Sequence, residues 1–337
     1  MKAGLHGLVR GWWRGEVGVW GRLLDVAALP LAWAYAGAVR TRNRGADRWG
    51  GVEVPGIRVV SVGNLVVGGT GKTPVSAWAA RLLCESGGRV ALVCRGYGGD
   101  EELLHRRWNP RVRVVAHPDR VAAVRDARAR GATAAVLDDG FQHRRLARQV
   151  DLVLLAAEDP FPGRLLPRGP YREPVGSLRR AHGVIVTRRT ASVEASQRLA
   201  EEVSRRFPQL VVGRLALLPG GWRTLSGEAA PEPAGPTLTV VGVARPEAVA
   251  NQVRAATGAE TELVALADHQ AYGPRDVERM RSLAAGRTVV VTEKDAVKLQ
   301  EYRSMLDPVR VLTQELRWEA GEEAVIDLVR TEAPGTV

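Results

Sequence analysis

A glycine-rich segment between residues 63 and 73 constrains the fold of this chain more than any other feature. The apolar run at residues 57–62 leads into the string Gly63-Asn64-Leu65-Val66-Val67-Gly68-Gly69-Thr70-Gly71-Lys72-Thr73, and a helical stretch follows. Glycines let successive backbone N–H groups converge on phosphate oxygens, and the N-terminus of the next helix adds partial positive charge. The order of strand, loop, Gly-Lys-Thr and helix therefore indicates a phosphate-binding loop, or P-loop.

Two residues of this loop have specific expected roles. Lys72 would contact the β- and γ-phosphates of a nucleoside triphosphate, and the Thr73 hydroxyl would bind Mg²⁺. Lys72 is one of only four lysines in an arginine-rich chain, and a planar guanidinium does not replace its compact ammonium. The strict motif has glycine where this chain has Val66. The predicted nucleotide-binding residues are Gly68, Gly69, Thr70, Gly71, Lys72 and Thr73.

From residue 57 onward, short β-branched runs alternate with helical stretches. Buried apolar strands that alternate with helices indicate a parallel sheet covered on both faces. Glycine- and proline-rich breaks at residues 219–221 and 228–236 indicate a connection, after which the alternation resumes. We therefore predict an α/β fold: a P-loop NTPase-like parallel sheet with flanking helices over residues 46–215, and a smaller C-terminal α/β lobe over residues 216–337.

The first 45 residues have a different character. Five of the nine tryptophans fall within the first 50 residues, and the longest uncharged stretch, residues 26–39, is interrupted by Pro30. A helix that crosses a bilayer needs about 20 apolar residues, so this stretch is too short. Arginines flank the tryptophan- and leucine-rich turns, which favours an amphipathic helical segment in the lipid headgroup region over residues 1–45. A helix packed on the protein core is the alternative.

The formal net charge of +11 favours an anionic partner. The arginines are scattered, without a run of five or six and without interleaved aromatic residues, so we do not expect a nucleic acid as the partner. An anionic membrane surface and a phosphorylated substrate remain, and no obligate protein partner is evident. Two cysteines, Cys84 and Cys94, cannot form a disulfide framework or a metal cage.

A second acidic element follows the apolar run at residues 132–137. Asp138 and Asp139 stand at the end of this predicted strand, directly before Gly140. In P-loop proteins a carboxylate at such a position holds the metal ion. A solvated acidic turn would have the same pattern, but the nearby P-loop favours the metal role.

The string Asp138-Asp139-Gly140-Phe141-Gln142-His143-Arg144 resembles the tetraacyldisaccharide 4′-kinase family, the lipid A 4′-kinases. Further blocks occur in the order that the family has, and together they extend from Ser61 to Lys298. They are Ser61 to Thr73, Arg95-Gly96-Tyr97, Gly99-Asp100-Glu101, Arg164 to Pro174, Gly242 to Pro246, Asp268-His269-Gln270, and Thr292 to Lys298.

The resemblance implies an enzyme that uses ATP and Mg²⁺. It would phosphorylate the 4′-hydroxyl of a tetraacylated glucosamine disaccharide 1-phosphate in lipid A biosynthesis. Its partners would be this acylated disaccharide lipid and the anionic membrane surface. Such enzymes are peripheral proteins on the cytoplasmic face of the inner membrane, which agrees with the interfacial segment inferred above.

The resemblance also implies roles for individual residues. Asp100 would be the base near the substrate hydroxyl, assisted by His269. The metal and phosphates would be held by Thr73, Asp138, Asp139 and Glu173. Tyr97, Arg120 and Arg172 would contact substrate. For the two arginines the reason is that a guanidinium binds a phosphate in bidentate fashion. The family often has a longer segment before Gly99-Asp100-Glu101 than the single Gly98 present in this chain.

Two other functions are compatible with parts of the sequence. A membrane-associated P-loop switch ATPase or GTPase would account for the P-loop and the acidic pair, but it would need neither Asp100 nor His269. The chain lacks an Asn-Lys-x-Asp guanine signature, so adenine is favoured. A nucleic-acid-binding protein would show binding with a steep salt dependence.

Overall fold

The computed structural model describes residues 9, 11–13, 15–96, 99–268 and 270–331. The chain divides into two compact units. The first contains residues 1–95, 109–215 and 318–337, and the second contains residues 96–108 and 216–317. The predicted limits of 46–215 and 216–337 did not anticipate that residues 96–108 join the second unit and residues 318–337 join the first.

The first unit is built on a parallel sheet whose neighbouring strands follow the order β3-β2-β4-β1-β5-β6. Nearly every residue of these strands is buried, as the uninterrupted apolar runs predicted. The α/β class with a parallel sheet is confirmed. The strands are β1 (Arg58–Asn64), β2 (Val90–Cys94), β3 (Arg113–Ala116), β4 (Ala134–Asp138), β5 (Val150–Ala156) and β6 (Gly183–Arg188).

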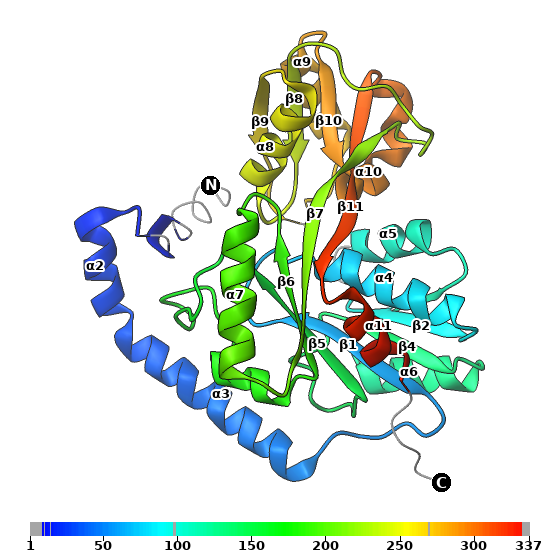
Figure 1. The fold of residues 1–337 in the computed structure, drawn as a ribbon. Helices are drawn as coiled ribbons and strands as arrows, with labels where there is room; N and C mark the ends of the chain where they lie inside the picture. Colours follow the sequence, from blue (N-terminus) through cyan, green and yellow to red (C-terminus); the bar gives the residue numbers. More distant parts are fainter. Residues whose placement is uncertain (1–8, 10, 14, 97–98, 269, 332–337) are drawn as a thin grey trace. The chain divides into compact units, whose positions relative to one another are not determined.

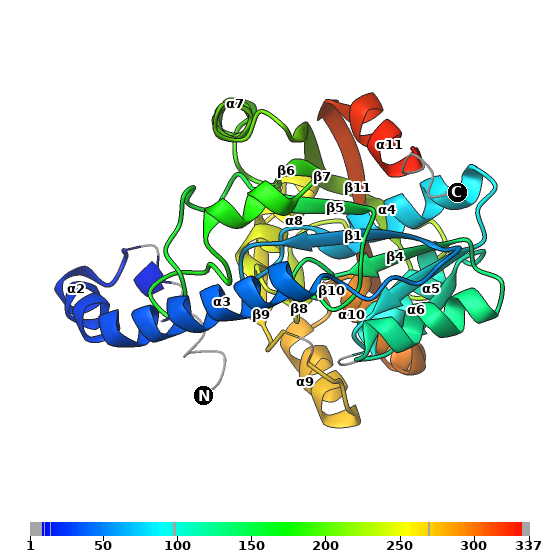
Figure 2. The same cartoon turned by 90° about the horizontal axis from the view of Figure 1, so that it is seen from below.

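Helices cover both faces of this sheet. Figure 2 shows α4, α7 and α11 on one side of β1 and β5, and α3 and α6 on the other. The side chain of Asp119 caps α6 by accepting hydrogen bonds from Val121 N (2.9 Å) and Ala122 N (3.2 Å). The helices are α4 (Lys72–Glu85), α6 (Arg120–Ala129), α7 (Val193–Arg206), α11 (Glu322–Arg330) and the 3₁₀ helix η1 (Val175–Arg180).

The N-terminal segment forms two helices, α2 (Gly18–Ala27) and α3 (Leu29–Trp49), which meet at a bend of 52° (Figure 1). Their apolar side chains are largely solvent-exposed, with Trp20 at 74% and Trp33 at 72%. In the described part of the chain, no single helix is long and apolar enough to cross a bilayer. The bent pair together passes the same test by length and composition only.

The second unit has its own parallel strands, β8 (Thr237–Val241), β9 (Thr261–Ala265) and β10 (Thr288–Thr292). β7 (Val211–Arg223) and β11 (Val309–Ala320) each have residues in both units. The expected connection at residues 219–221 is wrong, because these residues lie inside β7. The helices are α5 (Asp100–Trp108), α8 (Pro246–Thr257), α9 (Pro274–Ala284), α10 (Glu293–Leu299) and η2 (Gln300–Met305).

The core of the first unit requires glycine at position 63 in β1. A Cβ added there would lie 2.5 Å from Phe141 Cβ and 2.8 Å from Phe141 N. Phe141 is fully buried and follows the acidic pair that ends β4. The absence of a side chain at position 63 therefore lets the Asp138–Phe141 turn pack directly against β1.

We expect Gly63→Ala to lower the free energy of unfolding by about 1–3 kcal/mol, because overpacking displaces the buried phenyl ring. Urea denaturation measures this change. Gly37→Ala is the matched control, since nothing lies within 4 Å of an added Cβ on that exposed helical residue. It should raise the free energy of unfolding by roughly 0.5–1 kcal/mol. Equal stability of the two variants would contradict the close-packing argument.

Candidate active site

The P-loop connects β1 to α4 within the first unit. Gly68 (φ 124°) and Gly71 (φ 95°) have backbone conformations that L-residues rarely adopt. Asn64 Nδ2 donates to Thr70 Oγ1 at 2.9 Å, and Thr187 Oγ1 donates to the Thr70 carbonyl at 2.9 Å. Among the described residues no side chain caps α4, so its first N–H groups face the loop and can bind an anion. The sequence did not indicate Asn64 and Thr187 as the residues that brace this loop.

Three residues from distant parts of the sequence form a charged cluster beside the P-loop. Lys72 Nζ lies 3.6 Å from Asp139 Oδ1. Arg172 Nη1 donates to Asp139 Oδ1 at 3.2 Å and to Oδ2 at 3.0 Å. Burial raises the pKa of Asp139, but the two cations outweigh it and lower the pKa overall. Asp139 is therefore an ionised carboxylate that holds both cations at the phosphate loop.

Asp138 and Thr73 have the chemistry of a magnesium site. Asp138 ends β4, is almost fully buried, and accepts a hydrogen bond from Ser76 Oγ of α4 at 3.2 Å. Carboxylate and hydroxyl oxygens suit Mg²⁺, which usually takes one or two carboxylates together with substrate phosphates and water. No group of three or more His, Cys, Asp or Glu residues that could hold a metal exists among the residues described. The donor set therefore fits an ion that arrives with a nucleotide.

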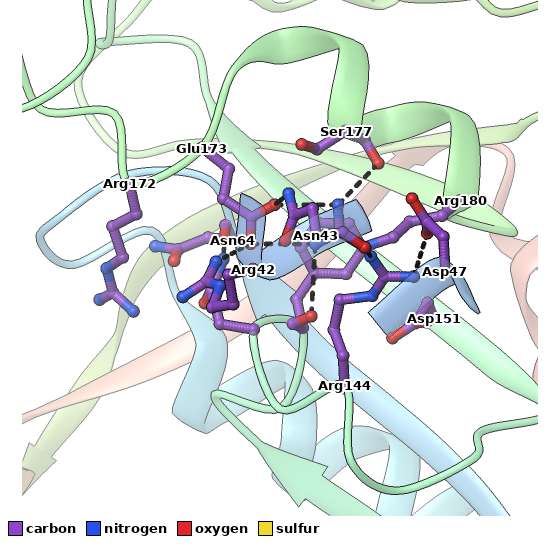
Figure 3. A network of polar contacts seen from close by, with 12 residues as sticks. Arg42, Asn43, Asp47, Asn64, Arg144, Asp151, Arg172, Glu173, Ser177 and Arg180 are labelled. Atoms are coloured by element: carbon purple, nitrogen blue, oxygen red, sulfur yellow. Dashed lines mark hydrogen bonds and ion pairs between the residues drawn. The ribbon is translucent and has the colours of Figure 1, made fainter. Parts of the chain in front are cut away.

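Glu173, which the resemblance implied as one of the metal-holding residues, lies among cationic and amide donors. Its carboxylate is fully buried, and both oxygens accept hydrogen bonds (Figure 3). The donors are Arg42 Nη2 (3.1 Å), Arg180 Nη2 (3.0 Å) and Asn43 Nδ2 (2.9 Å). Burial raises the pKa of Glu173, but Arg180 and these hydrogen bonds lower it overall. Through these contacts Glu173 joins α3 to η1, and its role in holding the metal ion stays a prediction.

Arg120, which is predicted to contact substrate, is held by backbone carbonyls. Its guanidinium is buried at 2% exposure. Nη1 donates to the Cys94 carbonyl at 2.8 Å and Nη2 to the Asp138 carbonyl at 3.4 Å. These carbonyls end β2 and β4, so Arg120 ties two strand ends together, and its contact with substrate stays a prediction. Tyr97 lies outside the described residues.

The second unit contains a buried carboxylate between two lysines. Asp100 begins α5 and is fully buried. Its Oδ2 lies 3.6 Å from Lys298 Nζ and 3.7 Å from Lys294 Nζ, both on α10. Burial lowers the pKa of Lys294, but Asp268 and Asp100 raise it overall. Lys294 and Lys298 lie four residues apart on α10 and so share one helix face. The sequence did not indicate that Asp100 is their partner.

The lysines of α10 also contact the residues on either side of His269. Lys294 Nζ donates to Asp268 Oδ1 at 3.0 Å, and Lys298 Nζ donates to the Gln270 carbonyl at 2.9 Å. His269 itself lies outside the described residues. The two lysines therefore connect Asp100 to Asp268 and to the Gln270 backbone within this unit.

A cavity of about 640 Å³ lies between the N-terminal segment and the loop at residues 160–170, within the first unit. Arg22, Arg164 and Arg168 line it, together with Asp25. Asp25 forms ion pairs with Arg164 and with Arg168, the latter at 3.7 Å. The sequence did not predict this cavity, because the arginines come from separate segments.

A family model described as tetraacyldisaccharide-1-P 4′-kinase matches residues 24–104 and 98–332. The chain belongs to this family. It is 37% identical to the tetraacyldisaccharide 4′-kinase of Anaeromyxobacter sp. (strain K) over 98% of this chain and 97% of that protein. It is 34% identical to that of Geobacter sulfurreducens over 91% of this chain and 95% of the relative.

A solved structure of this family has the same fold. It is the crystal structure of LpxK from Aquifex aeolicus in complex with ATP. The TM-score is 0.70 at 27% sequence identity, and the match covers 91% of this chain and 98% of that chain. The P-loop kinase fold predicted from the sequence is thereby confirmed.

We expect Glu173→Gln to lower the free energy of unfolding at pH 7 by about 3 kcal/mol, because it leaves the largely buried Arg180 guanidinium without its carboxylate. The folded-state pKa of Glu173 lies below its ordinary value of 4.5. Its contribution is therefore complete above about pH 4.5 and is lost as the pH falls through the lower folded-state pKa. The difference between variant and wild type should shrink in this acidic range, measured by urea denaturation at several pH values.

The control for this measurement is Glu202→Gln, which removes a surface ion pair with Arg206 on α7. We expect a change below about 1 kcal/mol. A pH-independent difference between wild type and Glu173→Gln would contradict the ionised, paired state of Glu173.

Proposed function

We propose that this protein transfers the γ-phosphate of ATP to the 4′-hydroxyl of a tetraacylated glucosamine disaccharide 1-phosphate, a step in lipid A biosynthesis. The observation that carries the proposal is the cluster of Lys72, Asp139 and Arg172 at the P-loop, in a chain whose residues 24–332 match the kinase family. Both cations come from motifs that the family resemblance includes.

Phosphoryl transfer requires alignment of donor and acceptor and neutralisation of charge on the migrating group. Lys72 and Arg172 supply two positive charges, and Asp139 holds them at the loop. The N-terminus of α4 binds phosphate oxygens through its backbone N–H groups. Mg²⁺, bound with ATP, supplies further charge neutralisation, and Thr73 and Asp138 are the residues that would hold it.

The acceptor is a sugar hydroxyl, which is a poor nucleophile until its proton is removed. A positioned carboxylate can contribute about 10²–10⁴-fold to the rate by taking this proton. Asp100 is assigned this role, and Lys294 and Lys298 orient its carboxylate by ion pairs to Oδ2. Asp100 Oδ1 accepts the Glu101 backbone N–H at 3.0 Å, which further restricts the side chain. A switch ATPase would have no use for this arrangement.

We expect Asp100→Asn to lower kcat by about 10²-fold or more, because the isosteric amide cannot accept the hydroxyl proton. The KM for ATP should change little, whereas Lys72→Ala should lose both turnover and ATP binding. Transfer of label from γ-labelled ATP to an acylated disaccharide 1-phosphate in detergent measures turnover.

Three outcomes of this assay contradict the proposal. Wild-type ATP hydrolysis without labelled lipid would favour the switch ATPase. Equal loss of kcat and ATP affinity in Asp100→Asn would remove the base assignment. Full activity of Lys72→Ala would remove the P-loop assignment.

We propose further that the protein lies peripherally on the cytoplasmic face of the inner membrane and contacts its anionic surface. The exposed apolar side chains of α2 and α3 support this placement, among them Val19, Trp20 and Trp33. The arginines around the adjacent cavity add positive charge next to this apolar surface. Such a combination is typical of helices that lie in the headgroup region.

We expect Leu23→Glu to weaken binding to phosphatidylglycerol vesicles by roughly tenfold, because a half-exposed leucine of α2 would lose its burial in lipid. Leu23 is 55% exposed, and the control Leu103→Glu in α5 alters a leucine that is 48% exposed. Vesicle co-sedimentation compares the variants, with phosphatidylcholine vesicles as the uncharged surface. Equal binding of both variants would contradict the assignment of α2 to the membrane surface.

A further inference from the structure

Polar contacts connect the exposed N-terminal helix α3 to a buried carboxylate next to the phosphate site. Arg42 Nη2 donates to Glu173 Oε1 at 3.1 Å and Asn43 Nδ2 donates to Glu173 Oε2 at 2.9 Å. Arg144 Nη1 in turn donates to the Asn43 carbonyl at 3.0 Å. Figure 3 shows the side chains of Arg42 and Asn43 pointing toward Glu173. Two consecutive residues of α3 thus each donate a hydrogen bond to a group that has no exposure to solvent.

The residue before Glu173 is fixed from two sides. The Arg172 backbone N–H donates to the Leu65 carbonyl in the P-loop at 2.7 Å. Tyr35 of α3 donates through its hydroxyl to the Arg172 carbonyl at 2.9 Å. The Arg172 guanidinium then reaches Asp139, which also contacts Lys72. Contacts therefore run without interruption from α3 through residues 172 and 173 to the P-loop lysine.

The charge balance explains why α3 matters to this arrangement. Arg180 also pairs with Glu173, at 2.9 Å, and its guanidinium lies 3.7 Å from the centre of the Phe141 ring. A buried carboxylate needs several donors, and losing those of α3 would leave Glu173 with fewer. Arg172 is its neighbour in the chain, so a displaced Glu173 would also shift the backbone from which the Arg172 guanidinium reaches Asp139.

We propose that Arg42 and Asn43 are positioning residues of the kinase: by holding Glu173, they keep Arg172 on Asp139 beside Lys72. This inference rests on the proposed function for the meaning of the Lys72–Asp139–Arg172 cluster. It adds that the helix expected to contact the membrane also completes the phosphate site. Seating of α3 and alignment of the transferred phosphate are therefore coupled.

The first test compares Asn43→Ala with Arg40→Ala, an exposed residue of the same helix. Asn43→Ala should lower kcat roughly tenfold, because it removes a hydrogen bond to a charged group. The KM for ATP should change less than twofold, with kcat expressed per ATP-binding site so that unfolded protein does not count. Arg40→Ala should have the activity of the wild type. An unchanged kcat for Asn43→Ala would overturn the proposal.

A double-mutant cycle separates positioning from a structural role. If Asn43 acts through Arg172, adding Asn43→Ala to Arg172→Ala should change kcat less than twofold. The same tenfold loss in both backgrounds would show that Asn43 acts independently and would overturn the proposal. If Arg172→Ala has no measurable turnover, the double variant Asn43→Asp, Glu173→Gln tests the positioning role instead. This exchange reverses the donor and the acceptor of the hydrogen bond between the two residues. Its kcat should exceed that of either single variant. An exchange variant no better than the singles would overturn the proposal.

The two proposals fail in different ways. If the wild type hydrolyses ATP but labels no lipid, the proposed function fails, and the same variants are then compared by their rate of ATP hydrolysis. If the wild type labels lipid and Asn43→Ala is as active as Arg40→Ala, only the positioning role fails.

Discussion

The carboxylate of Asp139, shared by Lys72 and Arg172, is the interaction on which the phosphate site depends. It joins the first residue of α4, the turn after β4 and a segment more than thirty residues further along the chain. Two cations placed close together would repel each other, and the ionised carboxylate between them offsets this repulsion. The P-loop thereby keeps a high positive charge density where phosphate oxygens bind.

The second unit contains the same arrangement of charge, one carboxylate between two cations. Asp100 is fully buried, and the ammonium groups of Lys294 and Lys298 balance its charge. A compact ammonium on a flexible stem can approach two carboxylates at once, as Lys294 does with Asp100 and Asp268. This explains why these positions remain lysine in a chain that otherwise uses arginine. Each unit thus contains a carboxylate that is held between two cations.

Much of the fold could be predicted because local patterns report burial directly. Apolar runs predicted buried parallel strands, and the glycine pattern predicted the P-loop before Lys72. The roles of Glu173 and Arg120 could not be predicted in this way. A carboxylate in a motif does not reveal its distant partners, and only the packing of α3 against residues 172–173 brings Arg42 and Asn43 to Glu173. The break at residues 219–221 was misjudged because a strand tolerates a proline where no neighbouring strand needs its N–H, and the two glycines keep theirs.

The sequence by itself determined the α/β class, the phosphate loop and the family, since these depend on residue order over short distances. The tertiary structure decided which charges meet: Asp139 with Arg172, Asp100 with Lys298, and Asn43 with Glu173. The physical reason is that an ion pair or hydrogen bond requires atoms within about 4 Å, whatever their separation along the chain. Residues 130 positions apart, such as Asn43 and Glu173, become neighbours only when the chain has folded.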